Sequence, residues 1–148
     1  MIHRRSLPCR RLALLLAGFT AAAANAACPP VESDGSVIRK GELALAWRPL
    51  LGAGKAPTSG RIPMARHFAL EVQICDKDTP SEVQLQKADA TMPAHRHGMN
   101  YRPVIKPLGA GRYRVEGMMF HMAGQWELAF EVKSGRETLR LSQEVHAD

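Results

Sequence analysis

Cysteine and aromatic side chains are scarce in this chain of 148 residues. It has three cysteines, two tryptophans, two tyrosines and four phenylalanines. The sequence contains no CxxC pair, CxxCH haem attachment, GxSxG nucleophile elbow or HExxH helix. These absences argue against a thiol redox enzyme, a c-type cytochrome, a serine hydrolase and a zinc protease that use these common motifs. We therefore expect a protein that is not an enzyme.

Long hydrophobic runs are also missing after the first 26 residues. Basic residues at the start precede an apolar run from Leu12 to Ala24, and Ala24-Asn25-Ala26 supplies the small residues of a signal-peptidase site. We expect residues 1–26 to be a secretory signal and the mature chain to be soluble and periplasmic, without a transmembrane segment. A lipoprotein anchored through Cys28 is the alternative, although Asn25 stands where a lipobox has a bulky aliphatic residue.

Most of the excess positive charge lies in this expected signal. The whole chain carries 20 basic and 14 acidic residues, a formal charge of +6. Four arginines lie in the expected signal, so the mature chain keeps 16 basic and 14 acidic residues, or +2. It has no basic run interleaved with aromatic residues, which argues against a nucleic-acid partner.

The cysteines give one expected cross-link. Cys9 leaves with the signal, so Cys28 and Cys75 remain as an even pair in an oxidising compartment. A disulfide between them is the expectation. The alternatives are a lipidated Cys28 without the disulfide, or a thiolate metal site, for which the two residues lack the usual close spacing.

The mature chain of about 122 residues is long enough for one core and reads as strands throughout. Apolar and polar residues alternate around Leu43, Leu45 and Trp47, and again from Phe68 to Ile74, as half-buried strands require. Further strands are expected at Val83, at Val104 and over 112–116, 125–132 and 138–142, with turns at 108–111, 122–124 and 133–135 and a long loop over 51–60. The pattern predicts an all-β fold, an antiparallel immunoglobulin-like sandwich of about seven strands over 41–148, preceded by an amino-terminal arm over 27–40.

Two clusters combine histidine with methionine. Met92-Pro-Ala-His-Arg-His-Gly-Met99 is followed by Met118-Met-Phe-His-Met122, and together they hold three histidines and five of the six mature methionines. A thioether prefers Cu(I), whereas imidazole serves either copper oxidation state, and carboxylates for calcium, magnesium or manganese are few here. In an extended segment, His95, His97 and Met99 would share one face.

The two clusters supply the candidate metal ligands: Met92, His95, His97, Met99, Met119, His121 and Met122. Each has a simpler explanation, because a histidine in a polar loop can be merely solvated and a methionine can fill a core. Met118 and Met119 face opposite sides of a strand, so one of them should be core, and we place Met119 on the face of His121. Trp47 and Trp126 are expected in the core, and His146 is expected to be mobile.

The ordered motifs resemble the YtkA-like domain family. The likeness rests on MP-x-H-x-H-G-M at 92–99, G-x-G-x-Y at 109–113 and M-x-G-x-W at 122–126, and it spans about residues 66–133. This family is similar in plan to exported FixH and CopC-like proteins, so the resemblance implies an immunoglobulin-like sandwich with a metal-related role. The chain departs from CopC-type proteins because Ala27, not histidine, begins the expected mature chain. That departure argues against their type of Cu(II) site and against a copper monooxygenase.

These observations predict a periplasmic copper-binding protein that acts as a carrier, buffer or assembly helper. Its partner would be a protein that donates or accepts copper. The alternative is a metal-free exported module whose loops dock on a membrane or redox partner.

Overall fold

The computed structural model describes residues 36–52, 62–76 and 83–148, and strands form most of this part of the chain. The strands are β1 (Ser36–Lys40), β2 (Leu43–Leu50), β3 (Phe68–Asp76), β4 (Val83–Met92), β5 (His97–Gly98), β6 (Val104–Gly109), β7 (Arg112–Met118), β8 (Gly124–Ser134) and β9 (Glu137–Ala147). A short 3-10 helix, η2 (Pro93–His95), joins β4 to β5. No helix among these described residues is long and apolar enough to span a membrane.

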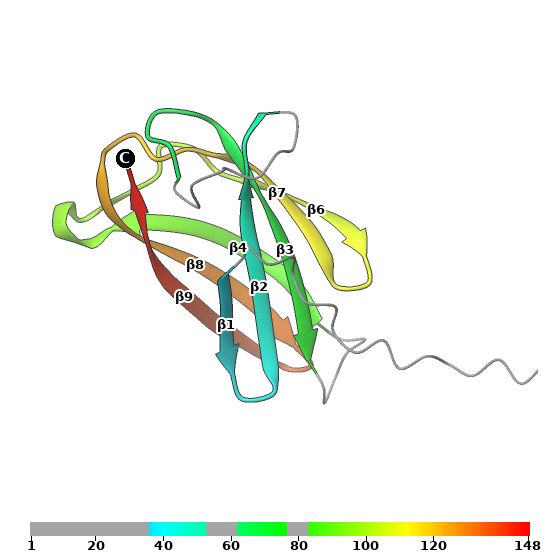
Figure 1. Cartoon of the computed structure of the whole chain (residues 1–148). Coiled ribbons are helices and arrows are strands. Elements are labelled where there is room, and N and C mark those ends of the chain that lie inside the picture. The colour runs from blue at the N-terminus through cyan, green and yellow to red at the C-terminus, as the bar shows by residue number, and fades with distance from the viewer. Residues whose placement is uncertain (1–35, 53–61, 77–82) are drawn as a thin grey trace, which may run out of the picture.

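The strands form two antiparallel sheets that pack face to face (Figure 1). One sheet has the order β1-β2-β3-β7-β6, and the other has the order β5-β4-β8-β9. Sequence alternation explains this arrangement, because a strand with one apolar face buries it against the facing sheet. The predicted all-β sandwich is confirmed, with nine strands in the described residues.

The core lies between the sheets and follows the predicted alternation. The inward positions of β3 and β8 are buried, and Leu70, Val72, Leu128 and Phe130 have no exposed surface. Both tryptophans belong to this core, as the sequence predicted, with Trp47 4% and Trp126 0% exposed.

The hairpin between β6 and β7 depends on Gly111. Its φ is +72°, and a Cβ atom there would lie 2.4 Å from the backbone oxygen of Ile74. The carbonyl of Gly111 also accepts a hydrogen bond of 2.8 Å from the Ile74 N–H. Only glycine satisfies both the positive φ and the close approach of the neighbouring strand.

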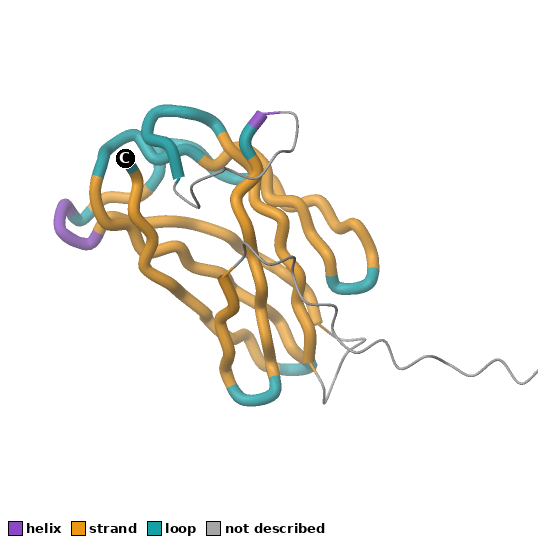
Figure 2. Tube along the Cα trace, in the orientation of Figure 1, coloured by secondary structure: helices purple, strands orange, loops and turns teal. Residues whose placement is uncertain are grey.

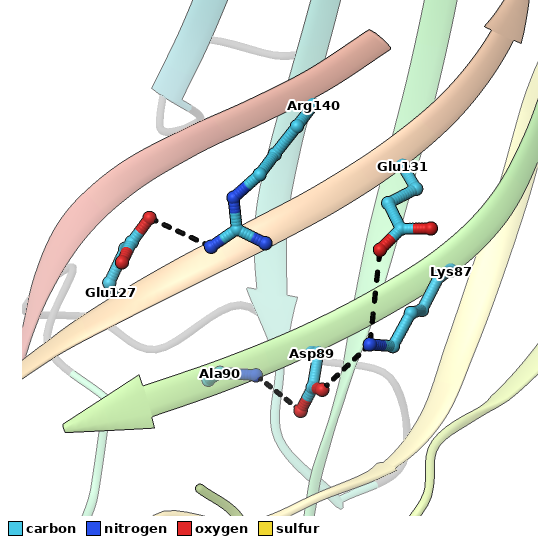
Figure 3. A network of polar contacts seen from close by, with 6 residues as sticks. All are labelled: Lys87, Asp89, Ala90, Glu127, Glu131 and Arg140. Carbon is cyan, nitrogen blue, oxygen red and sulfur yellow. Dashed lines mark hydrogen bonds and ion pairs between the residues drawn. The ribbon is translucent and has the colours of Figure 1, made fainter. Parts of the chain in front are cut away.

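The outer face of the β4-β8-β9 sheet carries a ladder of charges (Figure 3). Lys87 on β4 contacts Asp89 at 3.2 Å and Glu131 on β8 at 3.9 Å, and Arg140 on β9 contacts Glu127 at 2.9 Å. The hydrogen bond from Arg140 is the main reason that the pKa of Glu127 lies below its ordinary value. These exposed pairs add little stability each, but they mark this face as the solvated side of the sheet.

Three expectations about the fold meet different outcomes. β1 occupies 36–40, which the sequence analysis assigned to the amino-terminal arm, because this segment pairs with β2 in register from Ser36↔Trp47 to Lys40↔Leu43. The expectation of a mobile His146 was wrong. This residue lies in β9 opposite Gln125, and the adjacent Ala147 bridges Ile62. The signal segment, Cys28 and most of the loop over 51–60 lie outside the described residues, so the Cys28–Cys75 disulfide stays a prediction.

Candidate metal centre

The connection between β7 and β8 changes sheets. β7 pairs with β3 and β6, whereas β8 pairs with β4 and β9, so residues 119–123 cross from one sheet to the other. The turn expected at 122–124 is therefore not a hairpin, because the strands that flank it, β7 and β8, do not pair with each other. Figure 1 shows this connection reaching the end of the sandwich where the carboxyl terminus lies.

The first histidine motif forms a compact turn at the same end (Figure 2). Pro93 opens η2, and Arg96 closes it in the left-handed region with φ 53°, its N–H donating to the Pro93 carbonyl at 3.3 Å. The expected extended row of His95, His97 and Met99 was therefore wrong, since η2 and Arg96 interrupt it. Only from His97 onward is the chain extended beside β4.

Pairing with β4 sets the direction of His97. The register places His97 opposite Met92, and opposed residues of an antiparallel pair point to the same face. Met92 is 2% exposed and belongs to the core, so His97 is directed toward the inner face of the sheet. Met99 continues this alignment, because its N–H donates to the Ala90 carbonyl at 3.1 Å.

The two histidine motifs meet in space. The ring centres of His97 and His121 lie 5.0 Å apart, and those of His95 and His97 lie 5.8 Å apart. η2 itself contacts β8, which follows the second motif. Residues from β5 and from the connection between the sheets thus form one cluster.

Trp126 forms the floor of this cluster. The rings of His97 and His121 stand edge-on to its indole, with ring centres 5.9 and 5.4 Å away. Phe120 stacks on the same indole at 4.7 Å, and the indole N–H donates to the Met122 carbonyl at 3.0 Å. The indole is therefore held by stacking and a hydrogen bond, and it gives the histidines a rigid apolar base.

The three clustered histidines are not equally exposed. His95 is exposed, and His97 and His121 are half-buried. The Nδ1 atom of His121 is shielded from solvent and has no hydrogen-bond partner. A buried polar atom without a partner costs free energy, so its presence calls for an explanation such as a bound ligand.

The methionines divide into core and peripheral residues. Met92 and Met118 are 2% and 0% exposed, so each fills the core. The expectation that one of Met118 and Met119 is a core residue is met by Met118, while Met119 is half-buried. Met99 and Met122 are also half-buried and pack against the core.

The donor atoms of this end are imidazoles and thioethers. A metal-bound imidazole nitrogen lies about 2 Å from the ion, so two such nitrogens are within about 4 Å of each other, which rings 5.0 Å apart can supply. Across residues 36–52, 62–76 and 83–148, no three histidine, cysteine, aspartate or glutamate side chains group closely enough to hold a metal ion. A site here would therefore combine the His97–His121 pair with methionine sulfur.

Sequence reasoning missed two features of this region. It placed Trp126 in the core without its contacts to His97 and His121, for which the M-x-G-x-W spacing was the available signal. It also missed a cavity of about 420 Å³ next to Met99, lined in part by Lys87, Asp89, Tyr101 and Arg102. The cavity arises where β4 and the segment before β6 face each other, and local sequence carries no sign of it.

Comparisons with known proteins bear on the fold. No protein-family model matches the chain, and no curated protein matches its sequence. The structure is similar to that of a DUF4426 family protein from Pseudomonas aeruginosa PAO1, with a TM-score of 0.52 and 12% sequence identity over 78% of this chain and 96% of that one. At this identity the likeness shows a shared β-rich fold, and the resemblance to YtkA-like proteins stays a prediction.

Proposed function

We propose that the protein binds copper, preferring Cu(I), and serves as an exported carrier, buffer or assembly helper. The observation that carries this proposal is the His97–His121 pair above Trp126, in which the buried Nδ1 of His121 has no partner. A neutral imidazole with an open lone pair is a metal ligand. The pair supplies two such rings from segments about twenty residues apart in the chain.

The choice of copper rests on the rest of the donor set. Thioethers are soft ligands that select Cu(I), whereas carboxylate oxygens suit calcium, magnesium and manganese. Met99 and Met122 lie half-buried at this end of the sandwich, and Met92 stands opposite His97. Two imidazoles with one or two of these sulfurs give the three- or four-coordinate site that we propose for Cu(I).

Export and the Cys28–Cys75 disulfide belong to the same proposal. The signal segment implies a periplasmic location, where copper carriers would meet a protein that donates or accepts the ion. The proposed activity is binding and exchange rather than catalysis.

An anaerobic Cu(I) titration of the mature protein against a chromogenic chelator tests the proposal, with Cu(II) and Zn(II) in parallel. We expect one Cu(I) per chain, and at least a hundredfold weaker binding in His97→Ala and His121→Ala. His146→Ala is the matched control, because His146 is exposed on β9 outside the ring cluster. Absence of competition with the chelator would refute the copper function and leave docking by these loops as the explanation.

A further inference from the structure

The three clustered histidines form a path from solvent toward the core. His95 is exposed in η2, His97 is half-buried in β5, and His121 holds the buried Nδ1 atom beside Trp126. Consecutive rings are 5.8 and 5.0 Å apart. These separations are short enough for one ion to contact two neighbouring rings at a time.

The local backbone holds the outermost histidine in place. Pro93 fixes the first position of η2, and the left-handed Arg96 returns the chain toward β5 through its hydrogen bond to the Pro93 carbonyl. His95 is therefore not on a long free loop but one short turn away from His97. All four residues from Pro93 to Arg96 are exposed, so a docking protein can reach this turn.

We propose that His95 is the exchange ligand of the metal centre: it receives Cu(I) from a donor with soft ligands and passes it to His97 and His121. This inference rests on the proposed copper function. In the exchange, a His95 nitrogen binds Cu(I) as one donor ligand leaves; His97 and then His121 bind as the remaining donor ligands and His95 leave. The ion stays Cu(I) throughout, so the step needs no oxidant or reductant.

The role of His95 predicts a separation of rate from affinity. A ligand that is released in the final complex contributes little to equilibrium binding, but its loss slows the transfer. His95→Ala should therefore keep the Cu(I) affinity within about twofold while lowering the transfer rate at least tenfold. His95→Met should restore most of the rate, because a thioether also binds Cu(I).

Stopped-flow fluorescence measures the transfer directly. Cu(I) is supplied anaerobically as its bicinchoninate complex, and quenching of Trp126 reports arrival, since its indole lies 5.4 Å from the His121 ring. A Trp47→Phe background removes the second indole, which donates to Gln143 elsewhere in the fold. His67→Ala is the control for an exposed histidine, because its ring contact is with Tyr101.

The outcomes separate this inference from the proposed function. An unchanged rate in His95→Ala, with His97→Ala and His121→Ala still defective, would overturn the exchange role and leave the copper function standing. An equal fall in rate and affinity would also overturn it, by making His95 an ordinary ligand of the final site. A wild-type protein that binds no Cu(I) would overturn both.

Discussion

Replacing Gly111 by alanine should destabilise the sandwich far more than the same change at Gly41. Both glycines lie in hairpin turns at positive φ, +72° and +61°, so both substitutions pay a similar conformational cost of about 1–2 kcal/mol. Their surroundings differ. A Cβ at Gly41 meets nothing within 4 Å, whereas a Cβ at Gly111 would lie 2.4 Å from the Ile74 oxygen, closer than the 3.0 Å that real Cβ atoms respect.

The extra cost follows from the movement that relieves this overlap. The turn must shift away from β3, which strains the 2.8 Å hydrogen bond between the Ile74 N–H and the Gly111 carbonyl. Forced displacement of this kind typically costs about 1–3 kcal/mol. We therefore expect Gly111→Ala to lose about 2–5 kcal/mol of unfolding free energy, and Gly41→Ala to lose about 1–2 kcal/mol.

Urea unfolding followed by circular dichroism measures both variants at once, with equal m values as the check that the unfolded states are comparable. A difference of about 1–3 kcal/mol between them is the expected result. If the two variants are equally stable, the turn relaxes without cost, and the close approach to Ile74 does not explain the glycine.

Three further predictions concern the core, the charged face and the cross-link. Phe120→Ala removes a fully buried ring and should cost about 3–5 kcal/mol in thermal or urea unfolding, whereas a loss below about 1 kcal/mol would contradict its place in the core. The hydrogen bond from Arg140 is the main cause of the lowered pKa of Glu127, so this pair stabilises the fold near neutral pH and loses that effect as the pH falls below 4.5. The difference in unfolding free energy between the wild type and Glu127→Gln should stay under about 1 kcal/mol and shrink in acid. Intact-mass measurement before and after reduction should show a gain of two hydrogens from one Cys28–Cys75 disulfide, and alkylation of both thiols without reduction would refute it.

The strand positions could be predicted from the sequence because the alternation of apolar and polar residues is a local property. Leu43, Leu45 and Trp47 mark β2 without any knowledge of its partners. β1 escaped detection because its five residues are mostly exposed and its pairing with β2 depends on the tight turn at Gly41. His146 was misjudged for a related reason: the bridge between Ala147 and Ile62 is a contact between distant segments.

The candidate site shows where local patterns end. Residue chemistry singled out His97 and His121, but no local pattern in the sequence shows that the two side chains are close in space. They meet because the chain crosses between sheets after Met118, and strand pairing across the whole fold decides that crossing. Pro93 and the left-handed Arg96 likewise form a turn where we expected an extended segment through His95, and composition alone did not reveal this turn.

The crossing of residues 119–123 has a thermodynamic consequence. His97 belongs to the β5-β4-β8-β9 sheet, whereas His121 lies on the segment that ties this sheet to the other one. Under the proposed function, an ion held by both rings is a removable cross-link that exists only when the sandwich is closed. At a free Cu(I) concentration one hundred times the dissociation constant, such linkage adds about 2.7 kcal/mol to the apparent stability. Copper supply would then govern how strongly the protein resists unfolding.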